Sequence, residues 1–190
     1  IKKDDIYYIN LFLKGNTEAF TWLVEAHQDK VFNLAFRICG NREEAEEIAQ
    51  DAFMKAFRSL RGFRMKSSFS TWLYRITYNT SISYTRSRKK GILYLDEFPA
   101  DPDDFFRIAE NDEEAEREYR KSLVNFALQK ISEEERALIS LYYYDELSVE
   151  EISQITGMGV SNIKVRLFRA RQKMASIIEK TSNKKPAYNE

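Results

Sequence analysis

The sequence predicts an all-α fold, with two small helical domains joined by an acidic flexible linker and a helix-turn-helix in the C-terminal domain. All six glycines and all three prolines fall between segments of helical apolar periodicity, where they end helices. Residues 96–118 hold eleven acids against two arginines and lack a sustained apolar period. We therefore expect domains at 1–88 and 116–178, a linker at 89–115 and a tail at 179–190, whose final residues, NKKPAYNE, should be disordered.

The N-terminal domain is predicted to contain four helices. A short helix precedes Gly15, and a longer one follows the cap signal at Asn16 and Thr17 and ends at Gly40. The third, 42–60, repeats apolar residues at spacings of three and four, and a loop at 61–68 leads to a fourth at 70–88.

The C-terminal domain is predicted to begin within residues 112–119 and to continue as a helix through residue 131. Ser132 followed by three glutamates offers an N-terminal cap for a second helix, 136–144. The helix-turn-helix then occupies 148–173, with an acidic first helix, a turn marked by Gly157 and Gly159, and a second helix from about residue 160.

The second helix of this motif has the pattern of a helix that binds the DNA major groove. Ile163, Leu167, Ala170 and Met174 form one apolar seam, and no acid occurs between residues 160 and 174. Cations flanking such a seam neutralise phosphates, and small polar side chains reach base edges. The alternative is an ordinary solvated basic helix, but the glycine turn and the acidic preceding helix favour DNA binding.

Residues 61–91 mix aromatic side chains with cations, and their only charged side chains are basic. Unpaired bases stack on aromatic rings while cations hold the phosphates, so this stretch suits melted DNA. The alternative is that the aromatic residues belong to the core, as we expect for Trp72, Leu73 and Ile76. The outward face of 42–60 is acidic and partly apolar, which suits either solvent or a protein partner.

The remaining features argue against an enzyme, a metal site and a membrane protein. His27 and Cys39 are the only residues of their kinds, and there is no phosphate-binding glycine loop or Cys/His cluster. We expect no cofactor. A lone cysteine fits a reducing compartment, and no apolar run reaches membrane-spanning length. No signal peptide is recognisable, so we expect a cytoplasmic protein without membrane insertion.

Three segments together resemble the extracytoplasmic-function group of bacterial RNA polymerase sigma factors. They are NREEAEEIAQDAFMKAFRSLRGFR at 41–64, SSFSTWLYRITYNTSISYTR at 67–86 and ISEEERALISLYYYDELSVEEISQITGMGVSNIKVRLFRARQKM at 131–174. The resemblance implies binding to core RNA polymerase, selection of promoters, promoter melting and control by an anti-sigma factor. It also implies a linker that enters the polymerase cleft, although a solvated tether fits the sequence equally well.

The resemblance, together with the patterns above, assigns residues to three surfaces. The surface for the minus-thirty-five element comprises Ser161, Asn162, Lys164, Val165, Arg166, Phe168, Arg169 and Arg171. The surface for the minus-ten element comprises Phe63, Arg64, Lys66, Phe69, Arg75, Tyr78, Asn79, Arg86 and Arg88. The surface for core polymerase comprises Glu47, Gln50, Asp51 and Met54.

Two departures from the family pattern leave the promoter sequence open. The minus-ten region is rich in Ser and Thr, and Val165 stands where many relatives have Ser. The competing function is a stand-alone helix-turn-helix regulator, which should dimerise to bind paired half-sites. No heptad seam supports a dimer, so we expect a monomer when the protein is free.

Overall fold

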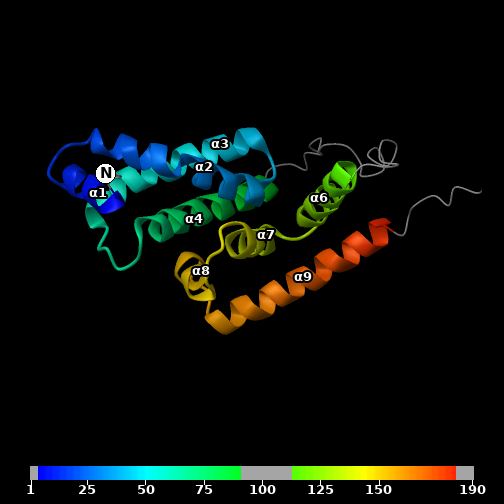
Figure 1. Cartoon of the computed structure of the whole chain (residues 1–190). Helices are drawn as coiled ribbons and strands as arrows, with labels where there is room; N and C mark the ends of the chain where they lie inside the picture. Colours follow the sequence, from blue (N-terminus) through cyan, green and yellow to red (C-terminus); the bar gives the residue numbers. More distant parts are fainter. Residues whose placement is uncertain (1–3, 91–112, 183–190) are drawn as a thin grey trace, which may run out of the picture.

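The computed structural model describes residues 4–90 and 113–182, and every regular element within them is helical (Figure 1). The predicted fold class is therefore confirmed for these residues. Most of the predicted linker, 91–112, and the end of the predicted tail, 183–190, lie outside the described residues.

The N-terminal helices are α1 (Asp5–Leu13), α2 (Ala19–Cys39), α3 (Arg42–Ser59) and α4 (Phe69–Lys90), with a 3₁₀ turn, η1 (Leu60–Gly62), after α3. Gly40 ends α2 in the left-handed region at φ 79°, as predicted. The predicted cap at Asn16 and Thr17 is wrong, because α2 begins after Glu18, which makes no side-chain cap bond. Instead, the backbone carbonyls of Asn16 and Thr17 accept from the amides that open α2.

The C-terminal helices are α6 (Glu113–Gln129), α7 (Glu133–Ile139), α8 (Val149–Thr156) and α9 (Val160–Ser182). The capping box at Ser132 is present, so α7 begins at Glu133 rather than at the predicted 136. Its continuation, η2 (Ser140–Tyr144), is π-helical. The helices α4, α6 and α9 also extend into residues predicted as linker or tail, namely 89–90, 113–115 and 179–182.

Three apolar clusters lie within the described residues, and the two largest organise the packing. One lies inside the N-terminal helices and joins α1, α2, α3 and α4 through residues such as Leu23, Leu60 and Leu73. The other crosses between the two groups of helices, bringing Leu34 of α2 and Tyr78 of α4 against Leu138 of α7. Figure 1 shows the consequence: α7 and α8 lie against α4, and α9 runs beside α7 from α8 towards α6.

Candidate DNA-binding and polymerase-binding surfaces

The helix-turn-helix is held by hydrogen bonds within its turn. A capping box joins Ser148 and Glu151 at the start of α8, and Gly157 ends α8 in the left-handed region at φ 75°. The Ser153 hydroxyl donates to the carbonyl oxygen of Met158 at 2.6 Å, and the Met158 amide donates to the Thr156 hydroxyl at 3.2 Å. These bonds fix the turn, and through it the direction in which α9 leaves α8.

The apolar seam of α9 faces the core and leaves the opposite side of the helix in solvent, as predicted. Ile163, Leu167 and Ala170 are buried in the cluster that crosses between the two helical groups. On the other side, Val165 is 46% exposed and Phe168 is 53% exposed. Ser161 and Asn162 are exposed as well, so the side chains predicted to reach bases are accessible.

The cations of α9 differ in how firmly they are held. Arg166 is half-buried, and it pairs with Glu134 of α7 at 2.9 Å and donates to the Asn162 side chain at 3.2 Å. Arg171 donates to the Tyr143 hydroxyl at 3.0 Å. Lys164 and Arg169 are exposed, and neither forms an ion pair with another residue in the part of the chain described here. The last two are therefore free to contact phosphate without breaking a contact within the protein.

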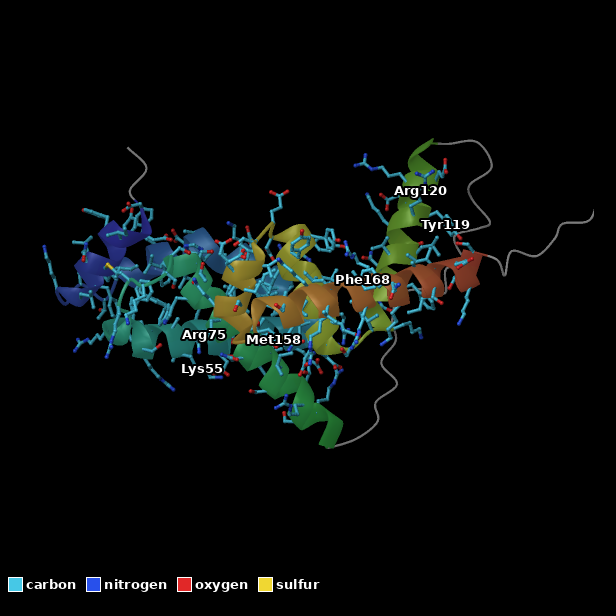
Figure 2. The ribbon with its side chains drawn as sticks, turned by 90° about the horizontal axis from the view of Figure 1, so that it is seen from below. Lys55, Arg75, Tyr119, Arg120, Met158 and Phe168 are labelled. Carbon is cyan, nitrogen blue, oxygen red and sulfur yellow. The ribbon has the colours of Figure 1, made fainter. Side chains whose placement is uncertain are left out.

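Some of the predicted minus-ten residues form an exposed stripe along α4. Arg75, Asn79 and Arg86 recur at spacings of four and seven and are all exposed, so they share one face of the helix. Arg64 and Lys66 extend the exposed basic surface into the loop before α4. Figure 2 shows Arg75 well away from Phe168 of α9, but the two predicted DNA surfaces approach each other at Glu134 of α7, which lies 3.8 Å from Arg86 and 2.9 Å from Arg166.

Two aromatic residues of the predicted minus-ten set are buried. Phe69 is 4% exposed, and its ring packs 5.2 Å from His27 and 5.7 Å from Trp72, measured between ring centroids. Tyr78 is 6% exposed in the cluster between the two helical groups, where burial raises the pKa of its hydroxyl. Contact of either residue with DNA stays a prediction, and it requires that the residue first becomes accessible. Phe63 is only partly buried and lies beside Trp72.

Arg88, also in the minus-ten set, is engaged by α3. Its Nη1 donates to both carboxylate oxygens of Glu44, at 2.8 and 2.9 Å. One turn earlier on α4, the Tyr84 hydroxyl donates to Glu47 at 3.0 Å; burial and then this bond raise the pKa of Tyr84 to about 12. Lys55 of α3 donates to Thr80 at 3.2 Å. The C-terminal half of α4 is thus fixed to α3 by three polar contacts.

The predicted polymerase-binding residues form one exposed strip on α3. Glu47, Gln50, Asp51 and Met54 are all exposed, and Met54 is 51% accessible. Phe57, a partly exposed residue that the sequence reasoning did not include, continues the strip by three positions. An acidic strip that ends in two accessible apolar side chains suits a protein partner rather than nucleic acid.

Comparison with known proteins decides the family. The profile described as Sigma-70 region 2 matches residues 23–91, and that described as Sigma-70, region 4 matches residues 123–174. The ECF RNA polymerase sigma factor SigW of Bacillus subtilis is 36% identical over 166 residues, which cover 84% of this chain and 88% of that protein. The ECF RNA polymerase sigma-E factor of Escherichia coli K12 is 32% identical over 165 residues, covering 84% and 86%.

The chain belongs to the extracytoplasmic-function group of sigma factors. It is an alternative sigma factor, which binds core RNA polymerase, directs it to specific promoters and assists promoter melting. Two solved structures share its fold, each with a TM-score of 0.64 and 23% identity. The first is CnrH in complex with the cytosolic domain of CnrY, and the match covers 92% of this chain and 97% of that one. The second is the sigma factor RpoE in complex with the anti-sigma factor NepR from Bartonella quintana, and the match covers 84% of this chain and 96% of that one.

The single histidine and the single cysteine of this sigma factor both make contacts within the protein. His27 is buried, and its Nε2 lies 2.9 Å from the Asp5 carboxylate, which joins α2 to α1. Cys39 is buried, and burial raises the pKa of its thiol, which donates to the Asn41 carbonyl at 3.2 Å. Within residues 4–90 and 113–182, no cluster of metal-binding side chains and no helix able to span a membrane is found.

The polar contacts between α3 and α4 are the part of the site that sequence reasoning missed. Glu47 was assigned only to the outward, polymerase-binding face and Glu44 was assigned to no surface, yet they bind Tyr84 and Arg88. The available signal was weak: acids three apart on one helix and, on the next, a tyrosine and an arginine four apart. Only the packing of the helices shows that they meet.

Proposed function

We propose that this sigma factor binds its promoter through two separate surfaces and binds the polymerase through a third. The exposed face of α9 contacts the minus-thirty-five element, and the basic stripe of α4 with the preceding loop contacts the melted minus-ten element. The strip on α3 binds core polymerase. The observation that carries the proposal is the separation of charge: α9 exposes no acid from residue 160 to 174, whereas α3 exposes an acidic and apolar strip.

At the minus-thirty-five element, α9 lies in the major groove. The short polar side chains of Ser161 and Asn162 are placed near its N-terminal end, where recognition helices contact base edges. Val165 and Phe168 offer apolar surface, which suits thymine methyl groups, while Lys164 and Arg169 contact phosphates. Selectivity for particular bases then depends on Ser161, Asn162, Val165 and Phe168. Affinity depends mainly on the cations Lys164 and Arg169.

At the minus-ten element, no catalytic group is required. Unpaired bases stack on accessible aromatic surface, for which Phe63 and Trp72 are the partly exposed candidates beside the basic loop. Bases captured in this way shift the equilibrium between closed and melted DNA by their binding free energy. Each promoter surface binds weakly alone, and the polymerase holds the two at a fixed separation, which raises their effective concentration.

The partners that we propose include an anti-sigma factor. The two solved structures named above are complexes, one with an anti-sigma factor and one with the cytosolic domain of a second protein. The exposed strip at Glu47 and Met54 is a suitable surface for it, because covering that strip would prevent polymerase binding. We further propose that the free protein is monomeric and acts in the cytoplasm, with domains at 1–88 and 116–178.

The experiment that tests this function is transcription in vitro with core polymerase on genomic DNA fragments, followed by mapping of start sites. We expect initiation only when the protein is added, with two shared sequence elements upstream of the start sites. Met54→Asp should abolish initiation by weakening polymerase binding, whereas the exposed Lys180→Gln on α9 serves as a control and should retain it. Sequence-specific binding of a dimer to paired half-sites, without polymerase, would instead favour the stand-alone regulator.

A further inference from the structure

His27 is the one hydrogen-bonding ring on the buried side of α2. It lies between Leu23 and Val31, one turn away on either side, at a position where an aliphatic side chain would continue the apolar seam. Its Nε2 lies 2.9 Å from Oδ1 of Asp5 on α1, and the His27 side chain is only 11% exposed. A buried polar ring needs such a partner, and the bond also fixes the rotation of the ring.

The imidazole of His27 meets Phe69, the first residue of α4. The two ring centroids are 5.2 Å apart and the ring planes are inclined at 66°, which is an edge-to-face arrangement. Phe69 is almost completely buried, so it offers no free face to a base. It is instead the support for two neighbouring rings.

The rings of Phe63 and Trp72 rest on Phe69, and both residues are partly exposed. The centroid of Phe69 lies 6.1 Å from that of Phe63 and 5.7 Å from that of Trp72. Phe63 and Trp72 also contact each other, with centroids 5.0 Å apart. No residue of the loop 64–68 is buried, so these ring contacts hold the start of the loop against α4.

A continuous set of contacts therefore runs from α1 to the surface proposed for unpaired minus-ten bases. Stacking of a base requires an aromatic face in a defined place, and a site is precise only when the residues behind it are themselves held. The exposed cations Arg64 and Lys66 follow Phe63 directly, where the phosphates that flank a stacked base would need them.

We infer that His27 is a positioning residue for the capture of an unpaired minus-ten base. Asp5 fixes its ring, the ring supports Phe69, and Phe69 sets the place of the pair formed by Phe63 and Trp72. The inference rests on the proposed assignment of that pair to melted minus-ten DNA. The alternative is that His27 only joins α2 to α1, a role that would stabilise the fold without reference to any base.

The test uses holoenzyme reconstituted with the full chain. Its DNA is a fluorescent promoter fragment whose minus-ten bases are kept unpaired by mismatches, with the element taken from start-site mapping. Phe63→Leu removes one ring of the pair and should weaken binding about fivefold or more, measured by fluorescence anisotropy. His27→Leu leaves both rings but removes their support, and should weaken binding by about two- to fivefold.

Base dependence separates positioning from a general loss of stability. Each minus-ten base is replaced in turn by an abasic site, and the affinities of parent and variants are compared on each fragment. The loss caused by Phe63→Leu should disappear at the position whose base is stacked, and the loss caused by His27→Leu should disappear at the same position. On the intact fragment, the double variant should bind as Phe63→Leu does. A loss on His27→Leu that persists on every fragment would overturn the inference.

Asp5→Ala is a second variant, because it removes the partner of His27 from a partly exposed site and keeps the imidazole. It should weaken binding with the same base dependence, by no more than His27→Leu does. Asn10→Ala, which truncates an exposed polar side chain of the same helix, is the matched control and should bind as the parent does. Parental affinity in either His27→Leu or Asp5→Ala would also overturn the inference.

Phe63→Leu distinguishes failure of the inference from failure of the proposed function. If this variant binds the unpaired fragment as tightly as the parent does, the minus-ten assignment is wrong, and the role of His27 fails with it. If Phe63→Leu weakens binding while His27→Leu does not, the minus-ten assignment stands and only the positioning role is overturned.

Discussion

Removal of one charge from α9, Arg169→Gln, should weaken binding at every promoter and reduce its salt dependence. Arg169 is exposed, and no ion pair holds it among the residues that the structure describes, so its full charge is available to a phosphate. Each neutralised phosphate contributes about 0.9 to the slope of log affinity against log salt. Between roughly 50 and 200 mM salt, one contact therefore accounts for about a 3.5-fold change in affinity.

Arg166→Gln provides an internal comparison, because Arg166 is paired with Glu134 at 2.9 Å with both side chains more than a third exposed. Such a pair is worth about 0.2–1 kcal/mol, so a DNA contact made by Arg166 is weakened by about 1.4- to 5-fold relative to one made by an unpaired arginine. The loss on Arg166→Gln should accordingly be smaller than the loss on Arg169→Gln.

The assay is fluorescence anisotropy of labelled promoter fragments with the reconstituted holoenzyme, at several salt concentrations and on at least two promoters. Lys180→Gln is the control, since it removes an exposed cation from the same helix beyond the predicted contacts. An unchanged slope for Arg169→Gln would show that Arg169 contacts no phosphate, and a loss confined to one promoter would show that it contacts a base.

Three further outcomes are expected. Ile163→Ala, at a fully buried position of the α9 seam, should lower the free energy of unfolding by about 2–5 kcal/mol, measured by denaturant titration followed by circular dichroism. Met54→Ala should change that free energy by less than about 0.5 kcal/mol, because the side chain is exposed, yet weaken competition for core polymerase. Burial raises the pKa of Asp145 above its ordinary 3.8, despite Tyr74 and Arg37. The folded protein therefore binds this proton more tightly than the unfolded chain does, so the contribution of Asp145 to the free energy of unfolding should decline as pH rises through the raised pKa; denaturant titrations at several pH values should show this decline, and Asp145→Asn should remove it.

The orientation of α9 could be predicted from sequence because it depends on local periodicity. Ile163, Leu167 and Ala170 recur at spacings that place them on one side of any helix, and burying that side leaves Val165 and Phe168 in solvent. The capping signals at Ser132 and Ser148 were predictable for the same reason, since each motif spans only four residues.

Long-range contacts were not predictable, and they alter the candidate site. An aromatic residue on an amphipathic helix fits a core and a stacking surface equally well, so the sequence could not show that Phe69 packs on His27. Nor does it show that Arg88 is held by Glu44, 44 positions away. The boundaries of α2 and α7 were misjudged because backbone bonds and a capping box, rather than the first apolar residue, determine where each helix begins.

The abundance of Ser and Thr in α4, which left the minus-ten preference open, has a packing explanation. Thr77 and Ser81 are fully buried, and their hydroxyls donate to backbone carbonyls four residues earlier, at 3.0 and 2.8 Å. Such bonds satisfy a buried hydroxyl without any partner from another helix. Small side chains let α4 lie close to α2 and α3 and also to the C-terminal helices, which α4 contacts more extensively than any other N-terminal helix does. Base preference should therefore be sought on the exposed stripe at Arg75 and Asn79, because the buried hydroxyls are already occupied.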